Sequence, residues 1–314
     1  MTLGSECGHE SVRQEEVSVA PEARRRRSAR PAPGRTRVAT RAQGWRKIAA
    51  ATWGEPVDPQ IYGDFDVDAE RLLAFVDQAR QATGAHVTVT HVVGKSVAHA
   101  LAEHPSLNTR LVRGRFVPRD SVDIFFVVAV DGGRDLSGVK VVGADRKSVA
   151  EIAEEVGRRA GSARTGDDAE FGKAKKVLAV TPRPLLRAGL RLHAWLTSDH
   201  DAEIHRLGIA RQPFGSGMIT SVGMFGVHRA YAPLSPFYRL PFLALVSEVT
   251  EKPVVRDGEI VARPMLTVSA TIDHRYYDGS HAAKLATSVR AYLDDPFAFE
   301  PAFAGTAEPA GQRR

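Results

Sequence analysis

The polar turn at residues 271–279 carries the side chains of this sequence that are best suited to chemistry. It reads T-I-D-H-R-Y-Y-D-G and lies between an expected strand and an expected helix. A rigid scaffold can present a side chain from such a turn into a cleft. Histidine takes up and releases protons near neutral pH, so His274 is the candidate general base. We expect Asp278 to hold the turn through a salt bridge and Gly279 to permit its tight bend.

Two other interpretations of this turn compete with catalysis. A single histidine in a turn is more often only a polar surface residue, and His274 by itself favours that interpretation. His274, Asp278 and His281 also have the spacing of metal ligands on one helical face. Gly279 and Ser280 indicate, however, that the helix begins only after Asp278, so the three side chains would not share a face. We therefore expect no metal site.

The elements that must position this turn can be placed from local signals. S-V-A-E at 148–151 is a capping box that opens a helix. The almost continuous apolar run at 122–130 fits a strand covered on both faces. Asp257-Gly258 predicts a hairpin turn between two short apolar runs. The chain is thus a mixed α/β protein with a largely antiparallel C-terminal half. Expected helices span about 68–83, 90–103, 148–163 and 280–293, and expected strands lie near 218–222, 241–249 and 265–272.

Charge and cysteine content restrict the classes of function. Residues 1–47 contain ten Arg and one Lys against five Glu, which accounts for the whole net charge of +6. The rest of the chain therefore has no electrostatic preference for nucleic acid. A single cysteine, Cys7, cannot form an internal disulfide, so a reducing compartment is expected. No apolar run is long enough to span a membrane, and the first residues lack the apolar core of a secretory signal. We expect a cytoplasmic protein.

Composition divides the chain into three parts. Residues 1–43 are rich in Arg, Ala, Pro and Ser and read as a disordered tail. We favour a solvated leader without a function of its own over a contact with nucleic acid or an anionic surface. Residues 44–298 alternate helices and strands and form the expected folded domain. Residues 299–314 are rich in Ala, Gly and Pro and read as a loose C-terminal tail.

Five segments, in chain order, resemble the catalytic domain of the 2-oxo acid dehydrogenase acyltransferases, in the chloramphenicol acetyltransferase-like superfamily. The turn at 273–279 resembles the family's DHRxxDG motif. The other segments are W-R-K-I-A at 45–49, D-F-D-V-D at 64–68, H-P-S-L-N at 104–108 and T-S-V-G-M-F-G at 220–226. The resemblance implies an α/β fold of the chloramphenicol acetyltransferase type, which is a two-layer sandwich with a mixed β-sheet, assembled as a trimer.

The resemblance also implies a reaction and the residues that perform it. The reaction is transfer of an acyl group between coenzyme A and a thiol such as dihydrolipoamide. His274 would take the thiol proton, and the Thr220 hydroxyl would stabilise the oxyanion, with Ser221 as the alternative donor. Asp278 resembles a structural carboxylate whose partner in the family is an Arg of the opening helix, and Arg46 fits that position. In family members the histidine and the hydroxyl come from adjacent subunits of a homotrimer.

The sequence departs from the family in two respects. No lipoyl domain and no peripheral-subunit-binding domain are expected before the catalytic part, so a lipoyl group would be supplied in trans by another protein. The connection at 172–215 is also longer than usual. Within it, residues 184–196 combine leucines with regularly spaced arginines and predict a basic amphipathic helix. We favour a helix packed on its own domain over one that lies on a membrane or lines an acyl pocket.

Two further functions remain open at this level. The acceptor is a small alcohol or amine if the chain behaves like the chloramphenicol acetyltransferase relatives. The D-H-R form of the motif favours a thiol acceptor, because those relatives more often begin the motif with two histidines. The second alternative is a non-catalytic trimeric scaffold. The presence of His274, Asp278 and the hydroxyl of Thr220 argues against it.

Overall fold

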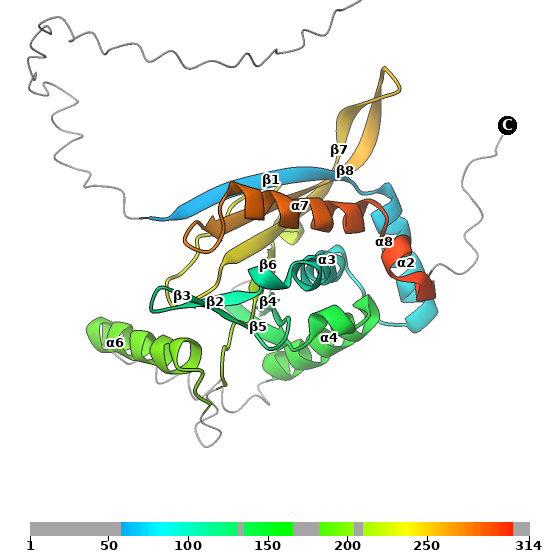
Figure 1. Ribbon diagram of the computed structural model, residues 1–314. Coiled ribbons are helices and arrows are strands. Elements are labelled where there is room, and N and C mark those ends of the chain that lie inside the picture. Colours follow the sequence, from blue (N-terminus) through cyan, green and yellow to red (C-terminus); the bar gives the residue numbers. More distant parts are fainter. Residues whose placement is uncertain (1–57, 131–134, 166–181, 204–209, 304–314) are drawn as a thin grey trace, which may run out of the picture. The chain divides into compact units, whose positions relative to one another are not determined.

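A six-stranded mixed β-sheet organises the chain in the computed structural model, which describes residues 58–130, 135–165, 182–203 and 210–303 (Figure 1). The strand order is β1-β8-β7-β6-β4-β5, and β6 runs parallel to both neighbours while the other pairs are antiparallel. The strands are β1 (Gln60–Asp68), β4 (Ile124–Val130), β5 (Asp135–Val141), β6 (Gly217–Ser221), β7 (Phe242–Arg256) and β8 (Glu259–Asp273). A separate hairpin pairs β2 (Thr109–Val112) with β3 (Arg115–Pro118).

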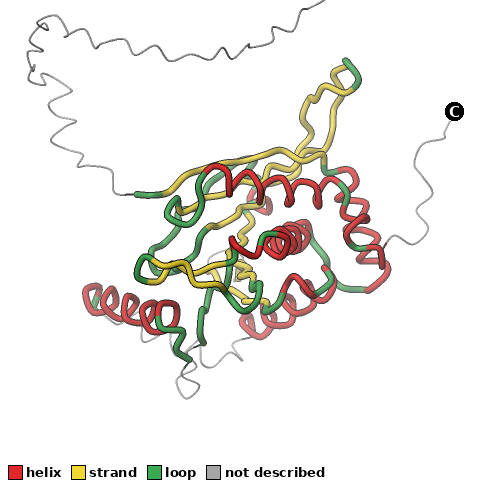
Figure 2. The backbone as a smooth tube through the Cα atoms, in the orientation of Figure 1, coloured by secondary structure: helices red, strands yellow, loops and turns green. Residues whose placement is uncertain are grey.

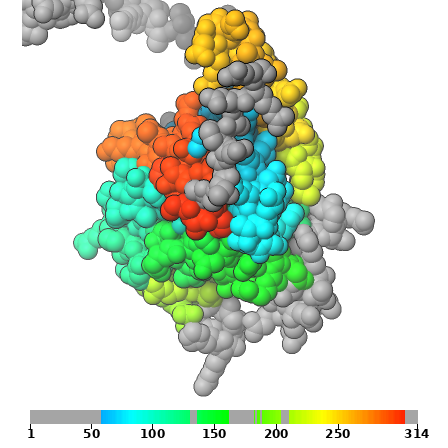
Figure 3. Space-filling model, turned by 90° about the vertical axis from the view of Figure 1, so that its right-hand side faces the viewer, coloured from blue at the N-terminus to red at the C-terminus, as the bar shows by residue number. Residues whose placement is uncertain are grey.

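Helices form the second layer (Figure 2). They are α2 (Glu70–Thr83), α3 (Val89–Glu103), α4 (Val149–Thr165), α6 (Arg183–Ala194), α7 (Gly279–Asp294) and α8 (Pro296–Phe299), with a π-helical turn at Trp195–Asp199 after α6. Apolar side chains of α2, α3, α4 and α7 meet one face of the sheet and make the main core. Figure 3 shows the end of the molecule where α2, α4 and α8 lie together, with the β7–β8 hairpin projecting above them.

Local sequence signals set several element boundaries as predicted. Ser148 and Glu151 form the expected capping box, in which the Ser148 amide donates to the Glu151 carboxylate at 2.7 Å. The hairpin turn between β7 and β8 falls at Asp257-Gly258, and both residues have positive φ, as a two-residue type I′ turn requires. Both predictions are confirmed. The sequence could make them because each feature depends only on neighbouring residues.

Strand β4 is covered on both faces, as its apolar sequence predicts. Ile124 and Phe126 point into the main core beneath the helices. Phe125 and Val127 point the other way, toward a smaller apolar cluster that includes Leu234 from the chain between β6 and β7. Successive side chains of a strand alternate between faces, so a strand needs apolar residues at every position when both faces are covered.

The sequence predicts that a loose C-terminal tail begins at residue 299, and this boundary is too early. Residues 299–303 are packed rather than loose, because Phe303 is buried and its ring meets that of Phe75 on α2 at 5.8 Å. Glu300 is also buried, with its carboxylate 3.9 Å from the ammonium group of Lys95 on α3. These contacts could not be read from a stretch that is rich in Ala and Pro.

Candidate active site

His274 follows the last residue of β8 and is held at the edge of the sheet by backbone hydrogen bonds. Its amide donates to the carbonyl of Pro59 at 2.8 Å, just before β1. The amide of Asp273 donates to the carbonyl of Pro241 at 2.8 Å, just before β7. The turn is therefore fixed to both strands that flank β8. The His274 side chain is exposed, which leaves the imidazole accessible to a reactant.

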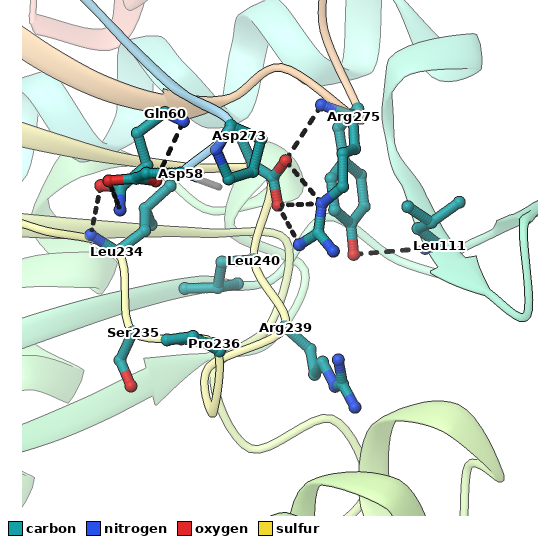
Figure 4. Close-up of a pocket in the computed structure, with 12 residues that line it drawn as sticks. Asp58, Gln60, Leu111, Leu234, Ser235, Pro236, Arg239, Leu240, Asp273 and Arg275 are labelled. Atoms are coloured by element: carbon teal, nitrogen blue, oxygen red, sulfur yellow. Dashed lines mark hydrogen bonds and ion pairs between the residues drawn. The ribbon is translucent and has the colours of Figure 1, made fainter. Parts of the chain in front are cut away.

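Asp273 and Arg275 form an ion pair inside the turn. The Arg275 guanidinium donates to both carboxylate oxygens of Asp273, at 2.9 Å from Nε and 2.5 Å from Nη2 (Figure 4). The Arg275 amide also donates to the same carboxylate at 3.0 Å. Hydrogen bonds to the buried carboxylate of Asp273 raise the pKa of the Arg275 guanidinium. Both residues line a small pocket of about 80 Å³ together with Arg239 and Tyr276.

Two buried tyrosines, which sequence reasoning missed, fasten the turn to the rest of the fold. The Tyr277 hydroxyl donates to the carbonyl of Leu107 at 2.7 Å. The Tyr276 hydroxyl accepts a hydrogen bond from the amide of Leu111 at 3.3 Å. The H-P-S-L-N segment at 104–108 therefore supports the histidine turn directly. Two large aromatic residues inside an otherwise polar turn were the available signal, because exposed turns rarely hold a Tyr-Tyr pair.

Asp278 caps helix α7, and its predicted salt bridge with Arg46 stays a prediction. Its carboxylate accepts from the His281 amide at 2.9 Å and from the Ser280 hydroxyl at 2.8 Å. The hydrogen bond from the His281 amide lowers the pKa of Asp278. Arg46, its predicted partner, lies outside the described residues. Gly279 is not in the left-handed region and a Cβ there would meet nothing within 4 Å, so the expected tight bend does not explain this glycine.

Thr220 and Ser221 end strand β6, and both side chains are half-buried. Alternation along the strand places Thr220 on the face of Met218 and Ser221 on the opposite face with Ile219. The following Gly223 approaches the neighbouring strand closely, since a Cβ at this position would lie 2.8 Å from the carbonyl oxygen of Ser247. This contact explains the first glycine of the segment at 220–226.

The structure does not bring Thr220 and His274 together within one chain. Thr220 pairs with Leu245 on β7, and Leu245 pairs with Ser269 on β8. His274 lies five residues beyond Ser269, which corresponds to roughly 16 Å along the strand. This separation far exceeds hydrogen-bond reach. One copy of the chain therefore cannot place both side chains on the same reacting group.

The described residues offer no alternative centre built on a metal. No group of three His, Cys, Asp or Glu side chains within 58–130, 135–165, 182–203 and 210–303 is arranged to hold a metal ion. In the same ranges, no helix is long and apolar enough to cross a membrane.

Most of the sequence matches one protein family. Residues 41–170 and 199–299 match the sequence profile of the 2-oxoacid dehydrogenases acyltransferase (catalytic domain) family. The chain belongs to this family. The matched residues include the turn at 271–279, the segment at 220–226 and the turn at 104–108.

Known members of the acyltransferase family agree in sequence and fold. The dihydrolipoyllysine-residue acetyltransferase component of the Bacillus subtilis pyruvate dehydrogenase complex is 28% identical over 238 residues, which are 74% of this chain and 44% of that protein. A probable dihydrolipoamide acetyltransferase from Listeria monocytogenes superposes with a TM-score of 0.56 at 22% identity, covering 82% of this chain and 94% of that one. The chain spans about half, or less, of the length of the curated relatives it matches.

A third acyltransferase of this fold has been studied for its mechanism. The dihydrolipoamide acetyltransferase of Azotobacter vinelandii superposes with a TM-score of 0.56 at 20% identity, covering 78% of this chain and 85% of that one. That work concerned the catalytic roles of one serine, one histidine and one asparagine, of which the asparagine follows the histidine by four residues. Asp278 follows His274 by the same interval.

The family profile leaves out residues 171–198, which include helix α6. Of the long connection predicted at 172–215, residues 172–198 lie outside the match, whereas residues 199–215 belong to it. The helix predicted at 184–196 is present, shifted to Arg183–Ala194 and followed by the π-helical turn.

Proposed function

We propose that this chain transfers acyl groups between coenzyme A and a thiol acceptor such as a dihydrolipoyl group. The observation that carries the proposal is the turn at 271–279, which holds an exposed imidazole on a rigid support in a member of this family. The relatives that match the chain are named as dihydrolipoyllysine-residue acetyl- and succinyltransferases, which supports a thiol acceptor.

The proposed mechanism uses two side chains of this sequence. The His274 imidazole takes the proton of the attacking thiol, and the thiolate forms a bond to the carbonyl carbon of the thioester. The Thr220 hydroxyl donates a hydrogen bond to the oxyanion of the tetrahedral intermediate, with Ser221 as the alternative donor. The intermediate collapses, the bond to the departing sulfur breaks, and that sulfur recovers the proton from the imidazolium. No step requires a metal ion.

The distance between these two side chains supports a site that two copies of the chain share. His274 of one copy would meet Thr220 of the next, and a closed ring of three copies gives three such sites. Asp278 serves this site by capping α7 and so holding the end of the turn. We further propose that the lipoyl group arrives on a separate protein and that the enzyme works in a reducing, cytoplasmic compartment.

The test measures acyl transfer from acetyl-, propionyl- and longer acyl-coenzyme A to free dihydrolipoamide. His274→Ala is expected to abolish transfer. Thr220→Ala is expected to lower kcat about 10²- to 10³-fold, as loss of one oxyanion donor does, whereas Thr220→Ser keeps most of the activity. The control is His86→Ala, which removes an exposed histidine between α2 and α3. A folded oligomer that transfers from none of these donors, or a His274→Ala variant with full activity, would overturn the proposal.

A further inference from the structure

Helix α6 lies in the part of the chain that the family pattern omits, and the proposed reaction does not use it. The segment is nevertheless firmly attached to the domain. The Arg110 guanidinium donates to the carbonyl of Ser198 at 2.9 Å, and the Gln212 amide donates to the carbonyl of Thr197 at 3.0 Å. Arg119, whose pKa burial lowers to about 10, donates to the Gln212 side chain at 2.5 Å. A helix held this way presents a defined surface.

One side of α6 packs on the domain. Ala194 is buried and His193 is half-buried, and the His193 ring lies 5.7 Å from the ring of Phe237. Burial lowers the pKa of His193, which favours the neutral form of its imidazole. The prediction that the helix packs on its own domain is therefore correct for this side only.

The opposite side of α6 is apolar and exposed. Leu185 is 64% exposed, Leu192 is 56% exposed and Trp195 is 43% exposed. These positions are seven and three residues apart, so they form one stripe along a helix. Ala188 and Gly189, which lie between them, are also exposed and add no charge. The helix lies at the margin of the domain (Figure 1).

The charged residues of the helix itself have one sign. Residues 183–198 contain three Arg and no Asp or Glu, and the first acidic residue after them, Asp199, pairs with Arg239 at 3.3 Å. Arginine recurs at every fourth position, at 183, 187 and 191, and Arg191 is exposed. A second copy of the same surface would bring these like charges together, which argues against self-association through α6. The complementary partner is anionic.

We propose that α6 binds the surface of a bilayer containing anionic phospholipids, with its axis in the plane of the membrane. The stripe of Leu185, Leu192 and Trp195 enters the boundary between headgroups and acyl chains, while the basic residues contact the phosphates. Tryptophan is enriched at that depth because its ring is apolar and its N–H is polar. A helix of 12 residues is too short to span the hydrocarbon core, so the contact is peripheral.

Vesicle sedimentation of the full-length protein tests this inference, which does not depend on the proposed reaction. The protein should sediment with phosphatidylglycerol–phosphatidylcholine vesicles, bind less as salt rises, and bind phosphatidylcholine alone weakly. The triple variant Leu185→Ser/Leu192→Ser/Trp195→Ser should bind about tenfold more weakly or worse. Val255→Ser/Ile260→Ser, which removes exposed apolar residues from the β7–β8 hairpin, is the matched control and should bind normally.

Fluorescence gives a second measurement at the same site. The chain has three tryptophans, so Trp45→Phe/Trp53→Phe leaves Trp195 as the only one. Its emission should shift to shorter wavelength with anionic vesicles and be quenched by brominated lipids. No sedimentation with anionic vesicles would overturn the proposal. Equal loss of binding in the hairpin control would also overturn the proposal. Vesicle binding that the triple variant keeps and that Arg24–Arg27→Ser abolishes would overturn it as well. Concentration-dependent oligomers that the triple variant loses, without lipid binding, would assign the stripe to a second copy.

Discussion

Thr220 lies on β6 and His274 directly follows β8 of the same sheet, yet the register of the strands between them places the two residues at different positions along the strands. The pairs Thr220–Leu245 and Leu245–Ser269 set these positions, and His274 follows Ser269 by five residues. If both side chains act on one thioester, they must come from different copies of the chain.

Mixed oligomers test this consequence. The His274→Ala enzyme is expected to be inactive alone and the Thr220→Ala enzyme only weakly active. Activity should rise when the two chains are co-expressed and assemble at random. About one site in four then combines an intact histidine with an intact hydroxyl from the neighbouring copy. The measurement is acyl transfer by mixed oligomers purified through two different tags. Activity no greater than the average of the two single variants would contradict a shared site.

Asp278 should matter to stability mainly as a helix cap. Asp278→Asn keeps an oxygen that can accept from the His281 amide, so its thermal midpoint should stay close to that of the wild type. Asp278→Ala leaves the first amides of α7 without that acceptor and should lower the midpoint by a few degrees. Thermal denaturation followed by circular dichroism compares the two variants. Equal losses in both would show that the charge, rather than the cap, stabilises the turn.

Two glycines of the family segments should respond differently to alanine. Gly223→Ala places a methyl group against the carbonyl oxygen of Ser247, so we expect a loss of about 1–3 kcal/mol in the free energy of unfolding. Gly279→Ala meets open space at the start of α7 and should leave stability unchanged or slightly higher. Urea denaturation measures both values. A destabilised Gly279→Ala variant would reveal a neighbour that the described residues of one chain do not supply.

His91 should make folding stability depend on pH. Its Nδ1 accepts from the Thr88 amide at 3.1 Å, and burial lowers its pKa to about 4. The unfolded chain binds this proton below pH 6.5 and the folded chain only below about 4, so stability is full above pH 6.5 and falls toward pH 4. The loss amounts to about 3 kcal/mol.

Substitution of His91 isolates this contribution. His91→Gln retains an acceptor for the cap and does not titrate in this range. Its free energy of unfolding should therefore change less than that of the wild type between pH 7 and pH 4.5 or so, as measured by urea denaturation at several pH values. Parallel pH profiles for the two proteins would contradict the role assigned to His91.

The sequence by itself determined the features that depend on neighbouring residues. The Ser148–Glu151 capping box, the Asp257-Gly258 turn and the apolar run of β4 each contain the whole cause of their structure within a few positions. The family resemblance was readable for the same reason, because the D-H-R-Y-Y-D-G turn and the segment at 220–226 are contiguous.

Only the tertiary structure decided what depends on residues far apart in the chain. Strand register between β6, β7 and β8 sets the distance from Thr220 to His274, and no local pattern specifies that register. The hydrogen bond from Tyr277 to Leu107 crosses 170 residues and gives the turn its support. The exposed side of α6 likewise depends on where Phe237 packs, since periodicity shows that a helix has two faces but not which of them the domain will cover.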